Sequence, residues 1–125
     1  MKQPLIIFAT LCFGMMLSAC DYNNGKQSAG ATSNGDGSIE IMSPAEGSTV
    51  AANQPLELKY KVTPSPQGNH VHISVDQGRP AVVRQMEGTF EIDPLSPGEH
   101  SIKIMEATSG HSPTGVETTL HVRAE

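Results

Sequence analysis

Residues 38–125 predict an all-β domain, and three observations carry this prediction. Apolar and polar residues alternate with a period of two through most of this region, as in strands that bury one face. Proline and glycine interrupt the alternation at short intervals, which indicates frequent turns. No ten-residue stretch has helical periodicity, and no internal repeat is visible. The chain therefore reads as a β-sandwich or barrel without helices.

The alternation predicts seven short strands, at residues 39–42, 56–63, 70–76, 81–85, 88–92, 101–107 and 116–123. The first strand ends at Ser43-Pro44, and the second ends at the Pro/Gly-rich residues 64–68. Turn formers at residues 76–78, 94–98 and 109–115 separate later strands. Seven strands of this length fit a single immunoglobulin-like β-sandwich.

Two segments resemble parts of the immunoglobulin-like and fibronectin type III modules of bacteria. Residues 95–104 (LSPGEHSIKI) are similar to the corner before the sixth strand of such modules, and residues 41–50 are similar to their first strand. The resemblance covers about 85 residues and implies a fold, not an activity. The chain also resembles small periplasmic domains of uncharacterised function that combine a His-x-His strand with a Pro-Gly-Glu-His corner.

The N-terminus has the features of an export signal. Lys2 precedes an uncharged apolar run at residues 5–17, which is shorter than the about 20 residues that a membrane-spanning helix needs. The sequence Leu17-Ser18-Ala19-Cys20 that follows resembles the lipobox of bacterial lipoproteins, in which the cysteine takes a diacylglyceryl group and becomes the first mature residue. Cys20 is therefore the predicted lipidation site, to be labelled by palmitate. The alternative is an ordinary signal cut near Ala19, leaving a soluble protein with a free thiol.

The resemblance to lipoproteins implies a location in the bacterial cell envelope, anchored to a membrane and facing the periplasm or the exterior. Asp21 looks like the residue that favours retention at the inner membrane in enteric bacteria. We expect three regions: a signal peptide at 1–19, the lipidated cysteine and a flexible Gly/Ser/Asn-rich linker at 20–37, and the sandwich domain at 38–125.

Composition narrows the classes of partner. The only cysteines are Cys12 and Cys20, so after lipidation no disulfide can stabilise the mature domain, which must depend on its hydrophobic core. The net charge is −5, which argues against a nucleic-acid partner. Tryptophan is absent and aromatic residues make up 4% of the chain, so a stacking platform for bases or sugars is not expected. The expected partners are the membrane and an unidentified envelope protein.

Catalytic motifs are missing from the sequence. No Gly-x-Ser-x-Gly elbow and no phosphate-binding glycine loop occur, and the carboxylates Glu87, Glu91 and Asp93 read as solvated strand residues. We therefore expect a protein that is not an enzyme.

Histidine is the one enriched residue type with a functional side chain. The chain contains five histidines. Val71, Ile73 and Val75 are expected in the core, so His70 and His72 should project together from the outer face of their strand. In an immunoglobulin-like sheet the third, sixth and seventh strands are neighbours, which places Met105 near His72 and brings the loop residue His111 to the same end. Imidazoles with a thioether suit copper, whereas three imidazoles suit zinc or copper equally.

The other two histidines are expected to do something else. His100 shares the phase of the buried isoleucines and should have a structural role at its corner, with its ring donating to the backbone. His121 is expected to be exposed near the opposite end of the sheet.

The sequence thus favours a membrane-anchored, non-enzymatic binding or accessory module of the cell envelope. The alternative is a small periplasmic copper or zinc protein with His70, His72, His111 and Met105 as ligands. A less specific interpretation of the same residues also stands, in which the histidines are polar surface residues and Met105 covers an apolar neighbour. A pH-responsive surface is a minor alternative, and an enzyme comes last.

Overall fold

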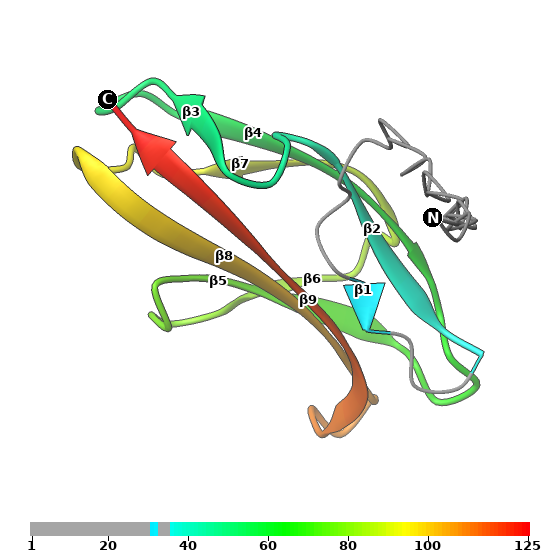
Figure 1. Cartoon of the computed structure of the whole chain (residues 1–125). Helices are drawn as coiled ribbons and strands as arrows, with labels where there is room; N and C mark the ends of the chain where they lie inside the picture. Colours follow the sequence, from blue (N-terminus) through cyan, green and yellow to red (C-terminus); the bar gives the residue numbers. More distant parts are fainter. Residues whose placement is uncertain (1–30, 33–35) are drawn as a thin grey trace, which may run out of the picture.

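The computed structural model describes residues 31–32 and 36–125, and these residues form a two-layered β-sandwich (Figure 1). The strands are β1 (Ala31–Thr32), β2 (Ser38–Ser43), β3 (Ser48–Val50), β4 (Leu56–Thr63), β5 (His70–Val75), β6 (Ala81–Val83), β7 (Glu87–Ile92), β8 (Gly98–Ala107) and β9 (Pro113–Ala124). The described part of the chain contains no helix, and so none that is long and apolar enough to cross a membrane. The all-β prediction is confirmed.

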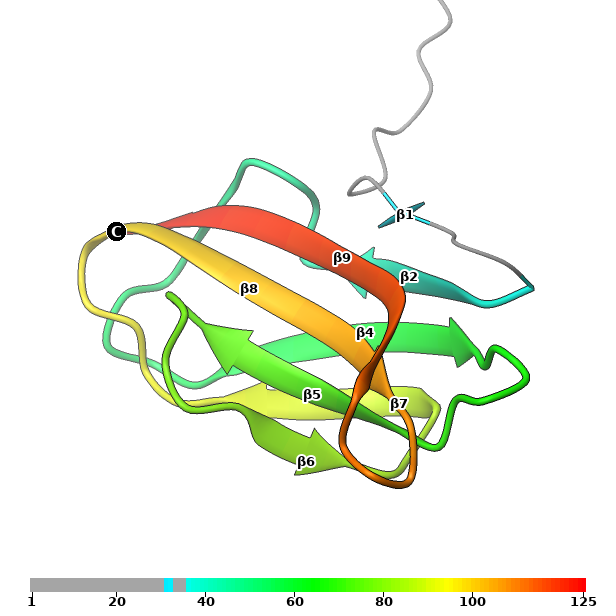
Figure 2. The ribbon, with the colours of Figure 1, turned by 90° about the horizontal axis from the view of Figure 1, so that it is seen from below.

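One layer is a six-stranded sheet and the other a three-stranded sheet. The larger sheet has the order β1-β9-β8-β5-β6, and β3 pairs with β9 in parallel. The smaller sheet has the order β2-β4-β7 and is antiparallel. In Figure 2 the strands β9, β8, β5 and β6 form the nearer layer, and β4 and β7 of the smaller sheet lie behind them. The third, sixth and seventh predicted strands therefore share a sheet, as expected from the immunoglobulin-like order.

The core lies between the two sheets and is mostly aliphatic. Its alternation is clearest in β4, where Leu58, Tyr60 and Val62 are buried between exposed charged and polar residues. The larger sheet contributes aliphatic residues at alternating positions of β5, β8 and β9, among them Val71, Ile73, Ile102, Ile104, Val116, Leu120 and Val122. The predicted inward residues Val71 and Ile73 are buried, and Val75 is partly buried against the core.

Two strands were not foreseen from the sequence. β3 is only three residues long and pairs through its backbone, so its side chains give little periodic signal. β1 consists of Ala31 and Thr32, which we expected in the linker, and it pairs with β9 at Glu117 and Thr118. Backbone pairing to an edge strand does not need apolar side chains, so composition alone did not reveal it. The signal sequence and Cys20 lie outside the described residues.

Candidate metal centre

Three histidine rings meet at one end of the larger sheet. His70 and His72 lie two residues apart on β5 and point to the same side, outward from the sandwich core. His111 comes from the turn between β8 and β9, which lies beside the beginning of β5 (Figure 2). A backbone hydrogen bond from Asn69 to the carbonyl of Ala107 joins this turn region to β5 (2.9 Å).

The three rings form a triangle of nitrogen atoms. Nε2 of His70 lies 3.0 Å from Nε2 of His72 and 3.1 Å from Nδ1 of His111, and the third side measures 3.3 Å. The ring of His111 lies edge-on to that of His70, with 4.6 Å between the ring centres. Among the described histidine, cysteine, aspartate and glutamate residues, these three form a group whose ligand atoms lie close enough together to hold a metal ion.

The environment of His70 favours its neutral form with a free lone pair toward the triangle. Burial lowers the pKa of His70, and the neighbouring His111, His72 and Arg84 lower it further. Oδ1 of Asn69 lies 3.1 Å from Nδ1 of His70 and accepts a hydrogen bond when the proton is on that nitrogen. In this tautomer Nε2 is unprotonated and faces the other two rings. A second partner that fixes a ring in this way is common for histidines that bind metals.

His70 is buried, although it lies on the outer face of the sheet. The side chain projects from the outer face as expected, but only 1% of the residue is accessible. The physical reason is the turn after β8, because the ring of His111 packs against His70 from outside the sheet. Exposure therefore increases across the triangle, with His70 buried, His72 intermediate and His111 exposed.

Met105 lies where the sheet order places it. It is the direct partner of His72 in the register between β5 and β8, so both side chains project from the outer face. Both also line a shallow groove of about 530 Å³ that runs over this face. Lys103 and His121 line the same groove further along the sheet.

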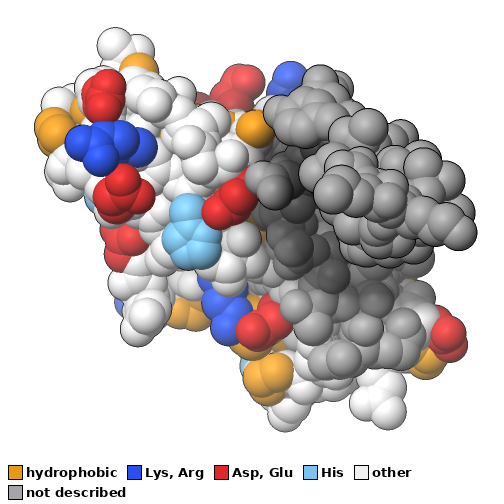
Figure 3. Space-filling view, in the orientation of Figure 1, with side chains coloured by type: hydrophobic (Ala, Val, Ile, Leu, Met, Phe, Trp, Pro, Cys, Tyr) orange, Lys and Arg blue, Asp and Glu red, His pale blue; other side chains and the backbone are white. Residues whose placement is uncertain are grey.

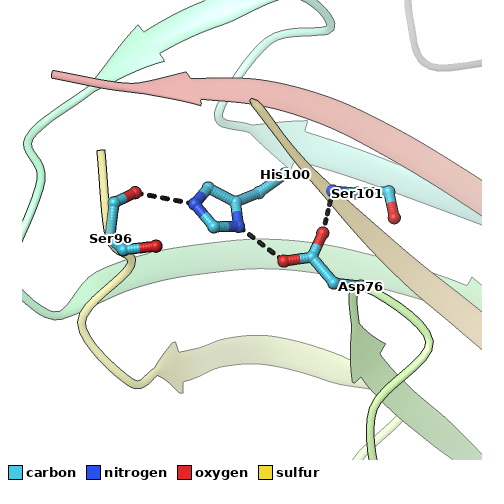
Figure 4. Close-up of polar contacts among 4 residues, drawn as sticks. All are labelled: Asp76, Ser96, His100 and Ser101. Atoms are coloured by element: carbon cyan, nitrogen blue, oxygen red, sulfur yellow. Dashed lines mark hydrogen bonds and ion pairs between the residues drawn. The ribbon is translucent and has the colours of Figure 1, made fainter. Parts of the chain in front are cut away.

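His100 belongs to a separate polar cluster (Figure 4). Its Nδ1 lies 2.5 Å from a carboxylate oxygen of Asp76, and its Nε2 lies 2.7 Å from the carbonyl oxygen of Ser96. Both partners are acceptors, so both ring nitrogens can donate only when the ring is protonated, and this geometry favours the imidazolium form. Asp76 is the larger cause that raises the pKa of His100, and the Ser96 carbonyl adds to it. The predicted structural role with a bond to the backbone fits this geometry.

Asp76 connects this cluster to a second strand. Its other carboxylate oxygen accepts a hydrogen bond from the backbone of Ser101 (2.9 Å). Burial acts to raise the pKa of Asp76, but the hydrogen bonds from Ser101 and His100 outweigh it and lower the pKa. The residue after β5 is thereby tied to β8 and, through His100, to the loop before β8.

His121 is exposed, as expected, and is far from the triangle in the register of the sheet. Its partner across β8 is Ser101, whereas the triangle lies at the other end of β8, near Ala107. Nδ1 of His121 lies 2.9 Å from a carboxylate oxygen of Glu46.

On the face seen in Figure 3, acidic and basic side chains are interspersed outside the grey region, and the hydrophobic groups are scattered.

A buried carboxylate near the triangle was missed from the sequence. Glu106 is fully buried on the core side of β8, opposite Val71. It accepts hydrogen bonds from the backbone and the hydroxyl of Ser65 (2.9 and 2.6 Å) and from the hydroxyl of Thr114 (2.6 Å). The available signal was a glutamate in the inward phase of Ile102 and Ile104.

Comparison with known proteins supports the fold and gives no family. No family model matches the chain, and no curated protein matches it. Among solved structures, the fibronectin(III)-like modules of CbhA from Clostridium thermocellum superpose with a TM-score of 0.55 at 18% sequence identity. The match covers 70% of this chain and 96% of that chain. The described domain therefore has the immunoglobulin-like sandwich architecture of a fibronectin type III-like module.

Proposed function

We propose that this chain is a membrane-anchored protein of the bacterial cell envelope whose sandwich domain binds a single copper or zinc ion. The ligands are His70, His72 and His111. The observation that carries the proposal is the triangle of ring nitrogens with sides of 3.0 to 3.3 Å. A binding role, not catalysis, is the function we assign to the domain.

The size of the triangle fits coordination of one ion. A tetrahedral ion with bonds of about 2.0–2.1 Å to nitrogen separates its ligand atoms by about 3.3 Å. Hydrogen bonds alone satisfy the triangle poorly, since each nitrogen has one lone pair or one proton and faces two others. His70 directs a lone pair inward when Asn69 accepts its Nδ1 proton. A cation at the centre would satisfy all three nitrogens at once.

Met105 makes copper the favoured metal. The described residues offer no fourth histidine, cysteine or carboxylate close enough to complete a tetrahedral site. Met105 is paired with His72 across β5 and β8 and lines the same groove. A thioether is a soft ligand of the kind that selects Cu(I), and imidazoles combined with a thioether suit copper. With Met105 the site suits Cu(I), and with a water molecule in its place the site suits Cu(II) or zinc.

The anchor places this domain at a membrane surface. Cys20 within the lipobox-like sequence is the proposed lipidation site, and the residues after it form the connection to the sandwich. Replacement of Cys20 by alanine should release the protein from membranes and abolish labelling with radioactive palmitate. Unchanged labelling would contradict the anchor and leave the proposed metal site unaffected.

Calorimetric titration with Cu(II) and Zn(II), and competition with a chromophoric chelator for Cu(I), test the metal proposal. The expected result is one ion per chain for the wild type and loss of that binding in His111→Ala. His121→Ala is the matched control, because it removes an exposed histidine that lies outside the triangle. Equal binding by the wild type and His111→Ala would refute the proposed site, and Met105→Leu should weaken Cu(I) binding selectively.

A further inference from the structure

Glu106 is the one fully buried carboxylate of the described domain. The buried polar or charged residues are His70, Glu106 and Thr118, so no buried lysine or arginine accompanies this carboxylate. None of the ion pairs among the described residues includes Glu106. A carboxylate in such a place is costly unless its hydrogen bonds compensate for the lost water. We therefore ask which segments of the chain the hydrogen bonds of Glu106 join.

The hydrogen bonds of Glu106 reach the two segments that carry the histidine triangle. Ser65 lies in the turn between β4 and β5, which leads directly into His70. Thr114 lies at the start of β9, immediately after the turn that carries His111. One carboxylate thus holds the segment before β5 and the segment after His111 to the same strand, β8.

The local backbone is adapted to this carboxylate. Gly68 packs so close to Glu106 that any side chain at position 68 would overlap the carboxylate oxygen. The register between β8 and β9 shifts between Met105 and Ala107, where β9 contains extra residues relative to β8. This irregularity lies at Thr114 and Gly115, and Thr114 reaches the carboxylate from there. The close packing and the bulge both serve contacts with Glu106.

We infer that Glu106 is the positioning residue of the histidine triangle: through Ser65 and Thr114 it fixes the distance between the rings of β5 and the ring of His111. This inference rests on the proposed metal site for its function, but the ring contacts can be tested without metal. Glu106 itself lies on the core side of β8, whereas the triangle lies on the outer side, so the carboxylate acts through the backbone and is not a ligand.

The first test is the arrangement of the rings in the metal-free protein. Nuclear Overhauser contacts between the rings of His70 and His111 should be strong in the wild type and lost in Glu106→Gln. Thr114→Val should weaken them, whereas Thr114→Ser, which keeps the hydroxyl, should restore them. Ile39→Val, a conservative change in the core of the smaller sheet, is the control for general destabilisation and should leave them intact.

The second test is metal affinity at a temperature where all variants are folded. Removal of a partner that orients a ligand typically weakens metal binding by about 10- to 100-fold, and we expect this loss in Glu106→Gln and not in Ile39→Val. Wild-type ring contacts with unchanged affinity in Glu106→Gln would overturn the inference. A wild-type protein that binds no copper or zinc would refute the proposed function, and the ring contacts would still decide the role of Glu106.

Discussion

The two ends of the larger sheet each hold a histidine cluster, and the clusters differ in the partners of their rings. At one end three imidazoles face each other, and none of the described carboxylates joins the triangle. At the other end His100 is enclosed by Asp76 and the carbonyl of Ser96. The first arrangement collects lone pairs and suits a cation, whereas the second arrangement holds a proton. Partner chemistry, not residue type, therefore separates a candidate ligand from a structural cation.

Strands β5 and β8, which carry residues of both clusters, contribute isoleucines to the core. Ile104 is fully buried and pairs with Ile73 across β8 and β5. Ile104→Ala should lower the free energy of unfolding by about 2 to 5 kcal/mol, because it leaves a cavity in an aliphatic core. Urea denaturation followed by circular dichroism measures this change. A loss below about 0.5 kcal/mol would contradict the inward phase of β8.

Replacing one histidine of each cluster by glutamine gives the next largest expected effect, on metal affinity. His70→Gln removes one of three proposed ligands and should weaken copper or zinc binding by more than about 100-fold, beyond the loss expected for a residue that only orients a ligand. His100→Gln should change the affinity by less than about twofold, a difference of roughly 0.4 kcal/mol. Chelator competition on both variants measures the contrast. Equal losses in the two variants would remove the distinction between the ends of the sheet.

The imidazolium of His100 should make stability depend on pH. Because Asp76 and Ser96 raise the pKa of His100 in the folded state, the contribution of this cluster is complete below the ordinary histidine pKa of about 6.5 and is lost as the pH rises through the raised value. His100→Gln should therefore cost about 1 to 2 kcal/mol near pH 5.5 and less near pH 9. Urea midpoints of both proteins at the two pH values measure this. A larger cost at pH 9 would show that the ring is neutral.

The smallest expected effect belongs to the exposed histidine. Nδ1 of His121 contacts Glu46, but 60% of the His121 side chain is accessible to solvent. Exposed pairs of this kind contribute between about 0 and 1 kcal/mol, so His121→Ala should change the free energy of unfolding by less than about 0.5 kcal/mol. The same urea experiment serves. A loss comparable to that of His100→Gln at pH 5.5 would show that the contact with Glu46 is structural.

Much of this arrangement could be predicted from strand periodicity. The alternation in residues 70–76 and 101–107 and the sheet order together placed Met105 beside His72 and His111 at the same end. The burial of His70 could not be predicted in this way, because it depends on how the turn after β8 folds over the sheet. The contacts of Glu106 were equally hidden. The contact with Ser65 joins residues 41 positions apart, and the contact with Thr114 depends on an irregularity between β8 and β9.

The free edge of β9 in the larger sheet is covered by two short strands. β1 covers this edge at Glu117 and Thr118, and β3 covers it from Val122 to Ala124. The opposite edge of the sheet is β6, which is only three residues long. Short or covered edges leave few free backbone groups for the strands of a neighbouring molecule. The larger sheet therefore offers few free backbone groups to a neighbouring copy, even where many copies of the domain lie side by side.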